Sequence, residues 1–129
     1  MTTVPKPRST ARFGVGMPAG IHLDSFGRNI HEAYGHVPYM VGTAARFKQW
    51  RDVDVRLIVP DAEFDALFPD YATLNQLDPR WALLCAAISE LGRMRTGLPI
   101  DFQFQRMTDA NARYDGPRHP LGVRFGVSR

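Results

Sequence analysis

The spacing of hydrophobic and polar residues changes along this chain, and each change marks an expected helix or strand. Apolar side chains three or four residues apart predict a helix over 25–34, with Asp24 or Ser25 as its N-cap. Alternation of apolar and polar residues within 98–107 instead predicts a strand with one apolar face. The predicted elements in chain order are helix 25–34, strand 37–41, helix 43–50, strand 52–59, helix 61–68, a helix from Pro79 to near Gly97, and strand 98–107.

Prolines, aspartates and glycines mark the ends of these elements. Pro60 ends the second strand because proline cannot donate a ladder hydrogen bond, and Asp61 is then the expected N-cap of the next helix. Asp78 followed by Pro79 predicts a cap and a first helical residue, and Gly97 predicts the end of that helix. This helix carries the clearest apolar stripe of the chain: Trp81, Leu84, Cys85, Ile88 and Leu91.

The order of elements predicts a small α/β (α+β) domain, with a mixed sheet of three or more strands and helices on one face. In the last strand, Ile100, Phe102 and Phe104 alternate with polar residues, as expected of a sheet with one face left open. Residues 1–20 are expected to be an N-terminal arm, 21–108 the domain, and 109–129 a basic, irregular C-terminal arm.

Composition narrows the class of protein further. The 129 residues are 44% apolar and 22% charged, which is typical of one globular domain. The N-terminus lacks the apolar core of a secretory signal and no apolar run reaches the ~18 residues of a membrane span, so we expect a cytoplasmic protein. The net charge of +3 permits anionic partners such as nucleotides or RNA. The single cysteine, Cys85, is expected to be a small buried hydrophobe, and the four histidines match no compact zinc pattern.

Two aspartates in the second strand are the strongest candidates for chemistry. Residues two apart on a strand share a face, so Asp52, Asp54 and Arg56 should stand opposite the valines that pack into the core. Asp101 would join them if its strand is a neighbour. Converging carboxylates repel unless cations neutralise them, and Mg²⁺ or Mn²⁺ prefers such oxygen ligands. A site for metal-dependent phosphoryl or nucleotidyl transfer is therefore expected here.

Gly42 and Thr43 are expected to bind the phosphates of a nucleotide. Glycine lets a phosphate approach the backbone, the start of the predicted helix supplies free N–H groups, and the threonine hydroxyl can donate. Nearby basic residues could neutralise a triphosphate: Arg46, Lys48, Arg51 and Arg56.

The segments VGT, AARFKQWR and DVDV together resemble the signature of the DNA polymerase beta-like nucleotidyltransferase superfamily, in its minimal form. The resemblance implies a phosphate-binding turn at Gly42 and Thr43, two metal-binding aspartates at Asp52 and Asp54, and a third carboxylate, which Asp101 fits. It also implies that Asp101 serves the side of the attacking hydroxyl. Thr43 departs from the usual glycine or serine but keeps a hydroxyl.

Two functions remain open from the sequence. The first is a metal-dependent nucleotidyltransferase that uses an NTP, with ATP the expected donor, and an RNA, protein or small-molecule acceptor. The second is an inactive module of the same fold that binds nucleotide, RNA or a protein partner, for example the neutralising partner of a toxin. In the second case Asp52 and Asp54 would form salt links with Arg51 or Arg56.

Overall fold

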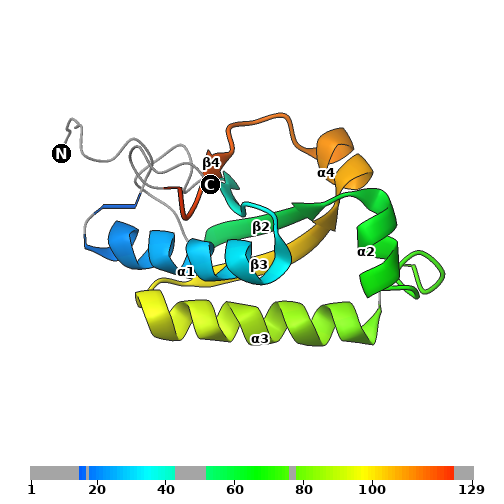
Figure 1. Cartoon of the computed structure of the whole chain (residues 1–129), viewed down its shortest axis with the longest axis horizontal. Coiled ribbons are helices and arrows are strands. Elements are labelled where there is room, and N and C mark those ends of the chain that lie inside the picture. Colours follow the sequence, from blue (N-terminus) through cyan, green and yellow to red (C-terminus); the bar gives the residue numbers. More distant parts are fainter. Residues whose placement is uncertain (1–14, 17, 43–51, 76–77, 124–129) are drawn as a thin grey trace.

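The computed structural model describes residues 15–16, 18–42, 52–75 and 78–123. In these ranges the chain forms four helices and four strands (Figure 1). The elements are α1 (Ala19–Tyr34), β1 (Tyr39–Val41), β2 (Val53–Val59), α2 (Asp61–Leu67), α3 (Pro79–Thr96), β3 (Ile100–Arg106), α4 (Met107–Arg113) and β4 (His119–Pro120). None of the helices described is both long and apolar enough to cross a membrane.

The strands form one mixed sheet in the order β3-β2-β1-β4. β2 and β3 run parallel, whereas β1 is antiparallel to both β2 and β4. This arrangement confirms the predicted α/β (α+β) class with a mixed sheet. The helix predicted over 43–50 lies outside the described residues.

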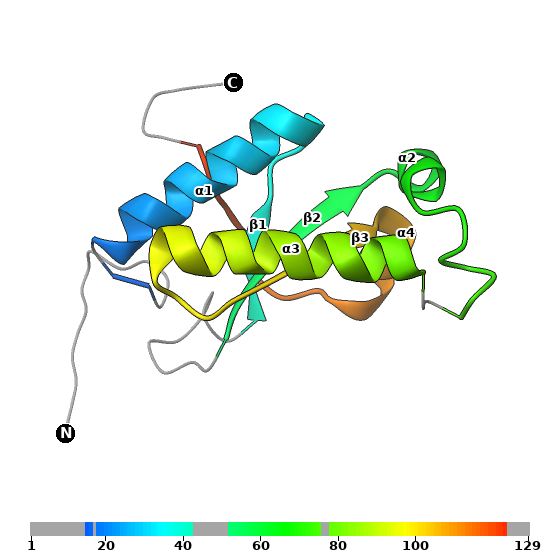
Figure 2. The ribbon, with the colours of Figure 1, turned by 90° about the horizontal axis from the view of Figure 1, so that it is seen from below.

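The core lies on the valine face of the sheet. Val53, Val55 and Leu57 of β2 are buried there, beside Ile100, Phe102 and Phe104 of β3. α3 packs along β3 and α1 packs on α3, as the view from below shows (Figure 2). The two helices meet at Gly92, where an added Cβ would lie 2.9 Å from the Phe26 ring. The helices α1 and α3 therefore cover the apolar face and leave the acidic face of β2 for a site.

The first helix is longer than predicted. It begins at Ala19, so Asp24 and Ser25 lie inside α1 and neither is its N-cap. The Asp24 carboxylate instead accepts a hydrogen bond of 2.7 Å from the backbone N–H of Gly122. A capping residue was expected because aspartate favours helix starts, but here the same acceptor serves a backbone donor far along the chain.

The predicted boundaries of α3 are confirmed. Asp78 accepts hydrogen bonds from the backbone N–H groups of Arg80 and Trp81, and Gly97 ends the helix with φ +73°. Asp61, however, is not a cap: it is the first residue of α2, and its carboxylate binds the backbone and hydroxyl of Thr108. Those hydrogen bonds lower the pKa of Asp61.

The residues of α3 that are buried differ in part from the apolar stripe predicted from the sequence. Cys85 is buried as predicted, and burial raises the pKa of its thiol to about 11. Leu91 is exposed, whereas Ser89 is buried. The Ser89 hydroxyl tolerates burial because it donates to the Cys85 carbonyl and accepts from the Phe102 N–H. A polar residue thus joins α3 to β3, which the apolar pattern could not predict.

The segment expected to be irregular, 109–129, contains regular structure where it is described. It includes most of α4 and the short strand β4, which pairs with β1. Leu121 follows β4, is 2% exposed, and its N–H donates to the Pro38 carbonyl at 2.9 Å. An added Cβ at Gly27 would lie 2.4 Å from the Leu121 Cβ, so α1 needs a glycine there. The correction follows from tertiary contacts, because the local pattern of this segment is turn-rich.

Leu121→Ala should destabilise the protein by about 2–5 kcal/mol, because it empties a buried leucine site. Leu83→Ala is the matched control, since Leu83 is 73% exposed on α3. Urea unfolding of both variants measures the difference. Equal free energies of unfolding would contradict the packing of this C-terminal segment on the core.

Candidate functional site

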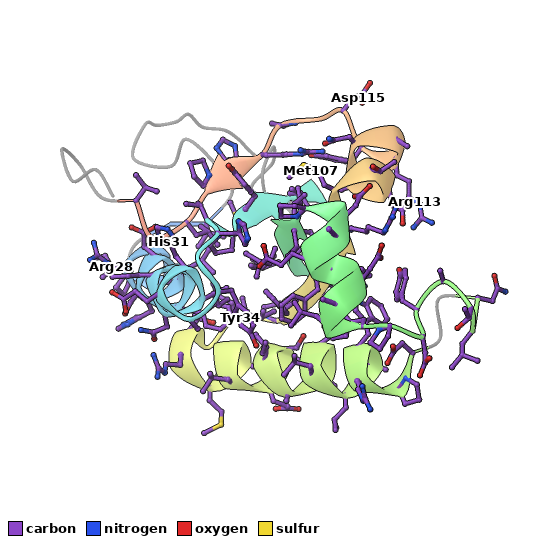
Figure 3. The ribbon with its side chains drawn as sticks, turned by 45° about the vertical axis from the view of Figure 1, so that its right-hand side comes forward. Arg28, His31, Tyr34, Met107, Arg113 and Asp115 are labelled. Atoms are coloured by element: carbon purple, nitrogen blue, oxygen red, sulfur yellow. The ribbon has the colours of Figure 1, made fainter. Side chains whose placement is uncertain are left out.

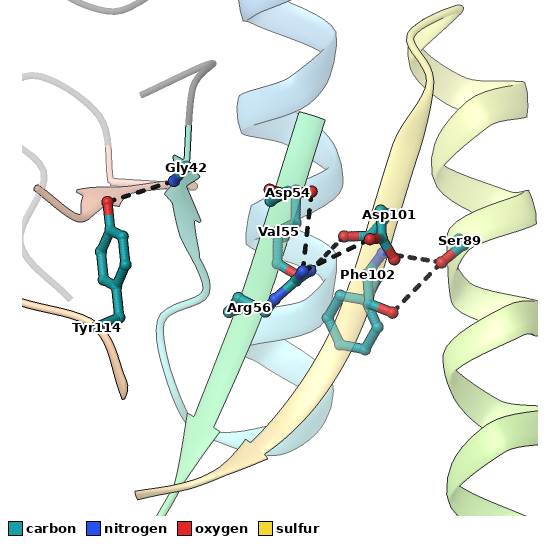
Figure 4. A network of polar contacts seen from close by, with 8 residues as sticks. All are labelled: Gly42, Asp54, Val55, Arg56, Ser89, Asp101, Phe102 and Tyr114. Atoms are coloured by element: carbon teal, nitrogen blue, oxygen red, sulfur yellow. Dashed lines mark hydrogen bonds and ion pairs between the residues drawn. The ribbon is translucent and has the colours of Figure 1, made fainter. Parts of the chain in front are cut away.

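The two carboxylates of the site face each other across neighbouring strands. Asp54 of β2 and Asp101 of β3 are direct register partners in the parallel pair. Their side chains stand on the face opposite the core, with exposed fractions of 28% and 44%. Figure 4 shows both beside one arginine. Asp54 and Asp101 therefore lie on neighbouring strands and on the same face of the sheet.

Arg56 lies between these two carboxylates. Its Nη2 is 3.8 Å from Asp54 Oδ1 and 3.5 Å from Asp101 Oδ2. Its Nη1 donates to the backbone carbonyls of Asp101 at 2.6 Å and Val55 at 3.2 Å. The guanidinium side chain is only 12% exposed and is held at four points, so it partly neutralises the acidic pair.

The carboxyl of Asp54 has a raised pKa. The main cause is burial; the neighbouring carboxylates Asp101 and Asp52 raise the pKa further, while the charge of Arg56 opposes them. Because the pKa of Asp54 is higher in the folded state than its ordinary value, protonation of Asp54 stabilises the fold. That contribution is complete below the ordinary pKa of 3.8 and is lost as the pH rises through the raised value. At neutral pH the ionised Asp54 therefore costs stability, which is common at functional sites.

Gly42 places backbone directly against Asp54. Its φ is +75°, in the left-handed region that favours glycine, and an added Cβ would lie 2.6 Å from Asp54 Oδ2. The Gly42 N–H donates to the Tyr114 hydroxyl at 3.3 Å (Figure 4). Both the dihedral angle and the contact require glycine at the end of β1.

A pocket of about 260 Å³ opens beside Asp54 and Gly42. Its described lining is Val41, Gly42, Asp54, Arg56, Ile58, Gln105, Arg113, Tyr114 and Arg118. Asp101 lines a separate pocket, of about 340 Å³, between β3 and α3. Arg56 thus stands at the border between a pocket with Asp54 and a pocket with Asp101.

The predicted site residues fall into three groups. The structure brings together Gly42, Asp54 and Arg56, with Asp101 on the other side of the guanidinium. Asp52 is exposed just before β2, close enough for its charge to act on Asp54. The remaining predicted residues lie outside the described residues: Thr43, Arg46, Lys48 and Arg51.

Sequence reasoning missed the wall of the pocket that follows α4. Tyr114 donates its hydroxyl proton to the Pro117 carbonyl at 2.7 Å, which leaves its lone pairs for the Gly42 N–H. Arg118 donates to the carbonyl of Tyr114 at 3.1 Å, and its guanidinium lies 5.9 Å from the centroid of the Tyr114 ring. The only signal in the sequence was the excess of arginine near the C-terminus.

The donor set is compatible with a hard divalent ion. Mg²⁺ is commonly held by one or two carboxylates together with substrate phosphates and water, and Asp54 with Asp101 supplies two such groups. Among the described residues no group of three or more histidine, cysteine, aspartate or glutamate side chains could hold a metal. A metal here would therefore depend on the substrate for part of its coordination.

Comparison of the chain with protein-family models, with curated proteins and with solved structures gives no match. The assignment of the site depends on the geometry of its own residues.

Arg56→Gln should raise the pKa of Asp54 further, because it removes the positive charge that opposes the effects of burial and of Asp101. The carbon-13 shift of the Asp54 carboxyl, followed through a pH titration, measures this change. Arg93→Gln is the control, since Arg93 pairs with Glu90 on the exposed surface of α3. An unchanged Asp54 pKa in Arg56→Gln would show that the ion pair has no electrostatic effect on the site.

Proposed function

We propose that this protein is a metal-dependent nucleotidyltransferase of the cytoplasm. It transfers a nucleoside monophosphate from an NTP, with ATP the expected donor, to a hydroxyl of an RNA, protein or small-molecule acceptor. One observation carries the proposal: Asp54 and Asp101 are register partners on parallel strands. The positive-φ backbone of Gly42, which lies against Asp54, agrees with it.

The residues of the site have distinct roles in this proposal. Asp54 and Asp101 hold Mg²⁺ or Mn²⁺, with Asp52 as a further carboxylate beside Asp54. The ion supplies positive charge where negative charge develops on the phosphates. Gly42 has no side chain of its own, so a phosphate can approach its backbone N–H. Arg56 keeps the two carboxylates close together despite their repulsion.

The reaction balances without a further reactant. The oxygen of the acceptor hydroxyl forms a bond to the α-phosphorus, and the bond from that phosphorus to the bridging oxygen of the β-phosphate breaks. Pyrophosphate leaves with the electron pair, and the acceptor proton passes to a carboxylate or to water. Because Asp101 borders the separate pocket between β3 and α3, we assign it to the acceptor side.

The test is incubation of the full chain with α-labelled NTPs, Mg²⁺ and a cell extract, followed by separation of labelled products. The double variant Asp52→Asn with Asp54→Asn should label nothing. Asp65→Asn is the matched control, because Asp65 pairs with Arg106 away from the pocket beside Asp54. Failure of the wild-type protein to label any acceptor with any of the four NTPs would reject transfer.

The ion pairs of Arg56 support a second candidate. A guanidinium already placed between Asp54 and Asp101 can satisfy both acids without a metal, as in a binding module for nucleotide, RNA or a protein partner. In that case the protein would bind an NTP or a partner and transfer nothing, and the double asparagine variant would keep the biological activity.

A further inference from the structure

The pocket beside Asp54 has an excess of positive charge. Among the described residues that line it, Arg56, Arg113 and Arg118 are positive and Asp54 carries the only carboxylate. Arg56 is shared with Asp54 and Asp101, whereas the half-buried Arg118 guanidinium donates to the neutral carbonyls of Ala110 and Tyr114. Within the described ranges, no carboxylate forms an ion pair with Arg118. The fold therefore fixes the position of the Arg118 guanidinium, and its positive charge can bind an anion.

Residues 114–118, which follow α4, form one wall of this pocket and are anchored at both ends. We call this segment the strap. On one side, α4 packs on β2 and β3; on the other, β4 pairs with β1 (Figure 1). The Tyr114 hydroxyl joins the strap directly to the Gly42 N–H. The acid of the strap, Asp115, is exposed and points outward from the sheet (Figure 3). The strap thus presents arginine to the pocket and aspartate to the outside.

The size of the pocket selects the part of a ligand that can enter. Its volume of about 260 Å³ lies below the roughly 300–1,000 Å³ of sites that enclose a whole small molecule. A phosphate chain is small and highly anionic, and planar guanidinium groups bind phosphate oxygens in pairs. A nucleobase and sugar would have to remain outside.

We propose that Arg118 and Arg113, together with Arg56, form the subsite for the β- and γ-phosphates of the triphosphate. The inference depends on the proposed function for the identity of the phosphate donor. A phosphate oxygen in this subsite takes the Gly42 N–H that the Tyr114 hydroxyl accepts in the structure. The C-terminal segment then supplies substrate-binding residues, with Arg118 dominant because Arg113 is exposed.

Calorimetric titration of the full chain with inorganic tripolyphosphate in Mg²⁺ buffer tests this subsite without any transfer step. Arg118→Gln should weaken binding about tenfold, as expected for one charge-assisted hydrogen bond, and Arg113→Gln about threefold. Arg118→Lys should bind more tightly than Arg118→Gln but less tightly than the wild type, because lysine keeps the charge and loses the planar pair of donors. Arg80→Gln, which removes an arginine on α3 outside the pocket, should change nothing.

The outcomes separate this inference from the proposed function. No binding of tripolyphosphate by the wild type, or equal binding by Arg118→Gln, would overturn the subsite even if transfer occurs. Weaker binding by Arg118→Gln in a protein that transfers no nucleotide would support the subsite and reject the enzyme. If Arg118→Gln does not fold, as judged by its unfolding transition, Arg113→Gln decides, and equal binding by that variant overturns the inference.

Discussion

Asp54→Asn should lower the rate of nucleotide transfer by about 10³-fold, equivalent to about 4 kcal/mol of transition-state stabilisation. Asparagine nearly preserves the shape of the side chain but removes the negative charge that would hold a cation beside the phosphates. Arg56 keeps its contacts with Asp101, so the substitution leaves no unpaired guanidinium. The loss should therefore appear in the rate and not in folding.

The same substitution should leave the protein equally stable or more stable at neutral pH. Burial raises the pKa of Asp54, so its ionised form destabilises the fold once the pH exceeds that raised value. Asparagine cannot ionise, so the free energy of unfolding of the variant should not fall in this way as the pH rises. Urea unfolding at several pH values, alongside transfer rates, measures both effects. Transfer at the wild-type rate by Asp54→Asn would show that Asp54 has no role in transfer.

Gly42→Ala should lower the transfer rate by about 10²-fold, because the new Cβ would lie 2.6 Å from Asp54 Oδ2 and the carboxylate must move. Alanine at φ +75° also strains the backbone by about 1–2 kcal/mol. Gly97→Ala is a close control: Gly97 has φ +73°, and none of the described residues outside its immediate neighbours comes within 4 Å of its added Cβ.

The comparison isolates the contact with Asp54 from backbone strain. Both variants should lose a similar free energy of unfolding, measured in urea, since the Asp54 carboxylate can swing aside. Only Gly42→Ala should lose activity. Equal activities of the two variants would mean that the position of the Asp54 carboxylate beside Gly42 has no role in transfer.

Much of the fold follows from local signals in the sequence. Asp78 and Gly97 bound α3 as predicted, because a cap acceptor and a left-handed glycine act within one turn of the chain. The alternation of β3 also predicts its buried and exposed faces correctly. The approach of Asp54 to Asp101 follows from the same period of two once the two strands are neighbours.

The rest depends on contacts between distant parts of the chain. Gly122 and Asp24 are 98 residues apart, and Tyr114 and Gly42 are 72 apart, so no local pattern predicts either hydrogen bond. β4 spans two residues and exists because β1 offers an edge with which to pair. Arg113 and Arg118 were visible only as part of an excess of charge, and their place around the pocket with Asp54 required the fold.

The most direct test of the account compares two labels in one NTP. The wild-type protein is incubated with Mg²⁺, an acceptor extract and NTP labelled on either the α- or the γ-phosphate, and labelled acceptor and released pyrophosphate are counted. We predict that α-label enters the acceptor with one pyrophosphate released per transfer, and that γ-label appears only in pyrophosphate. Transfer of γ-label to an acceptor, or the absence of any transfer, would contradict nucleotidyl transfer at the site of Asp54 and Asp101.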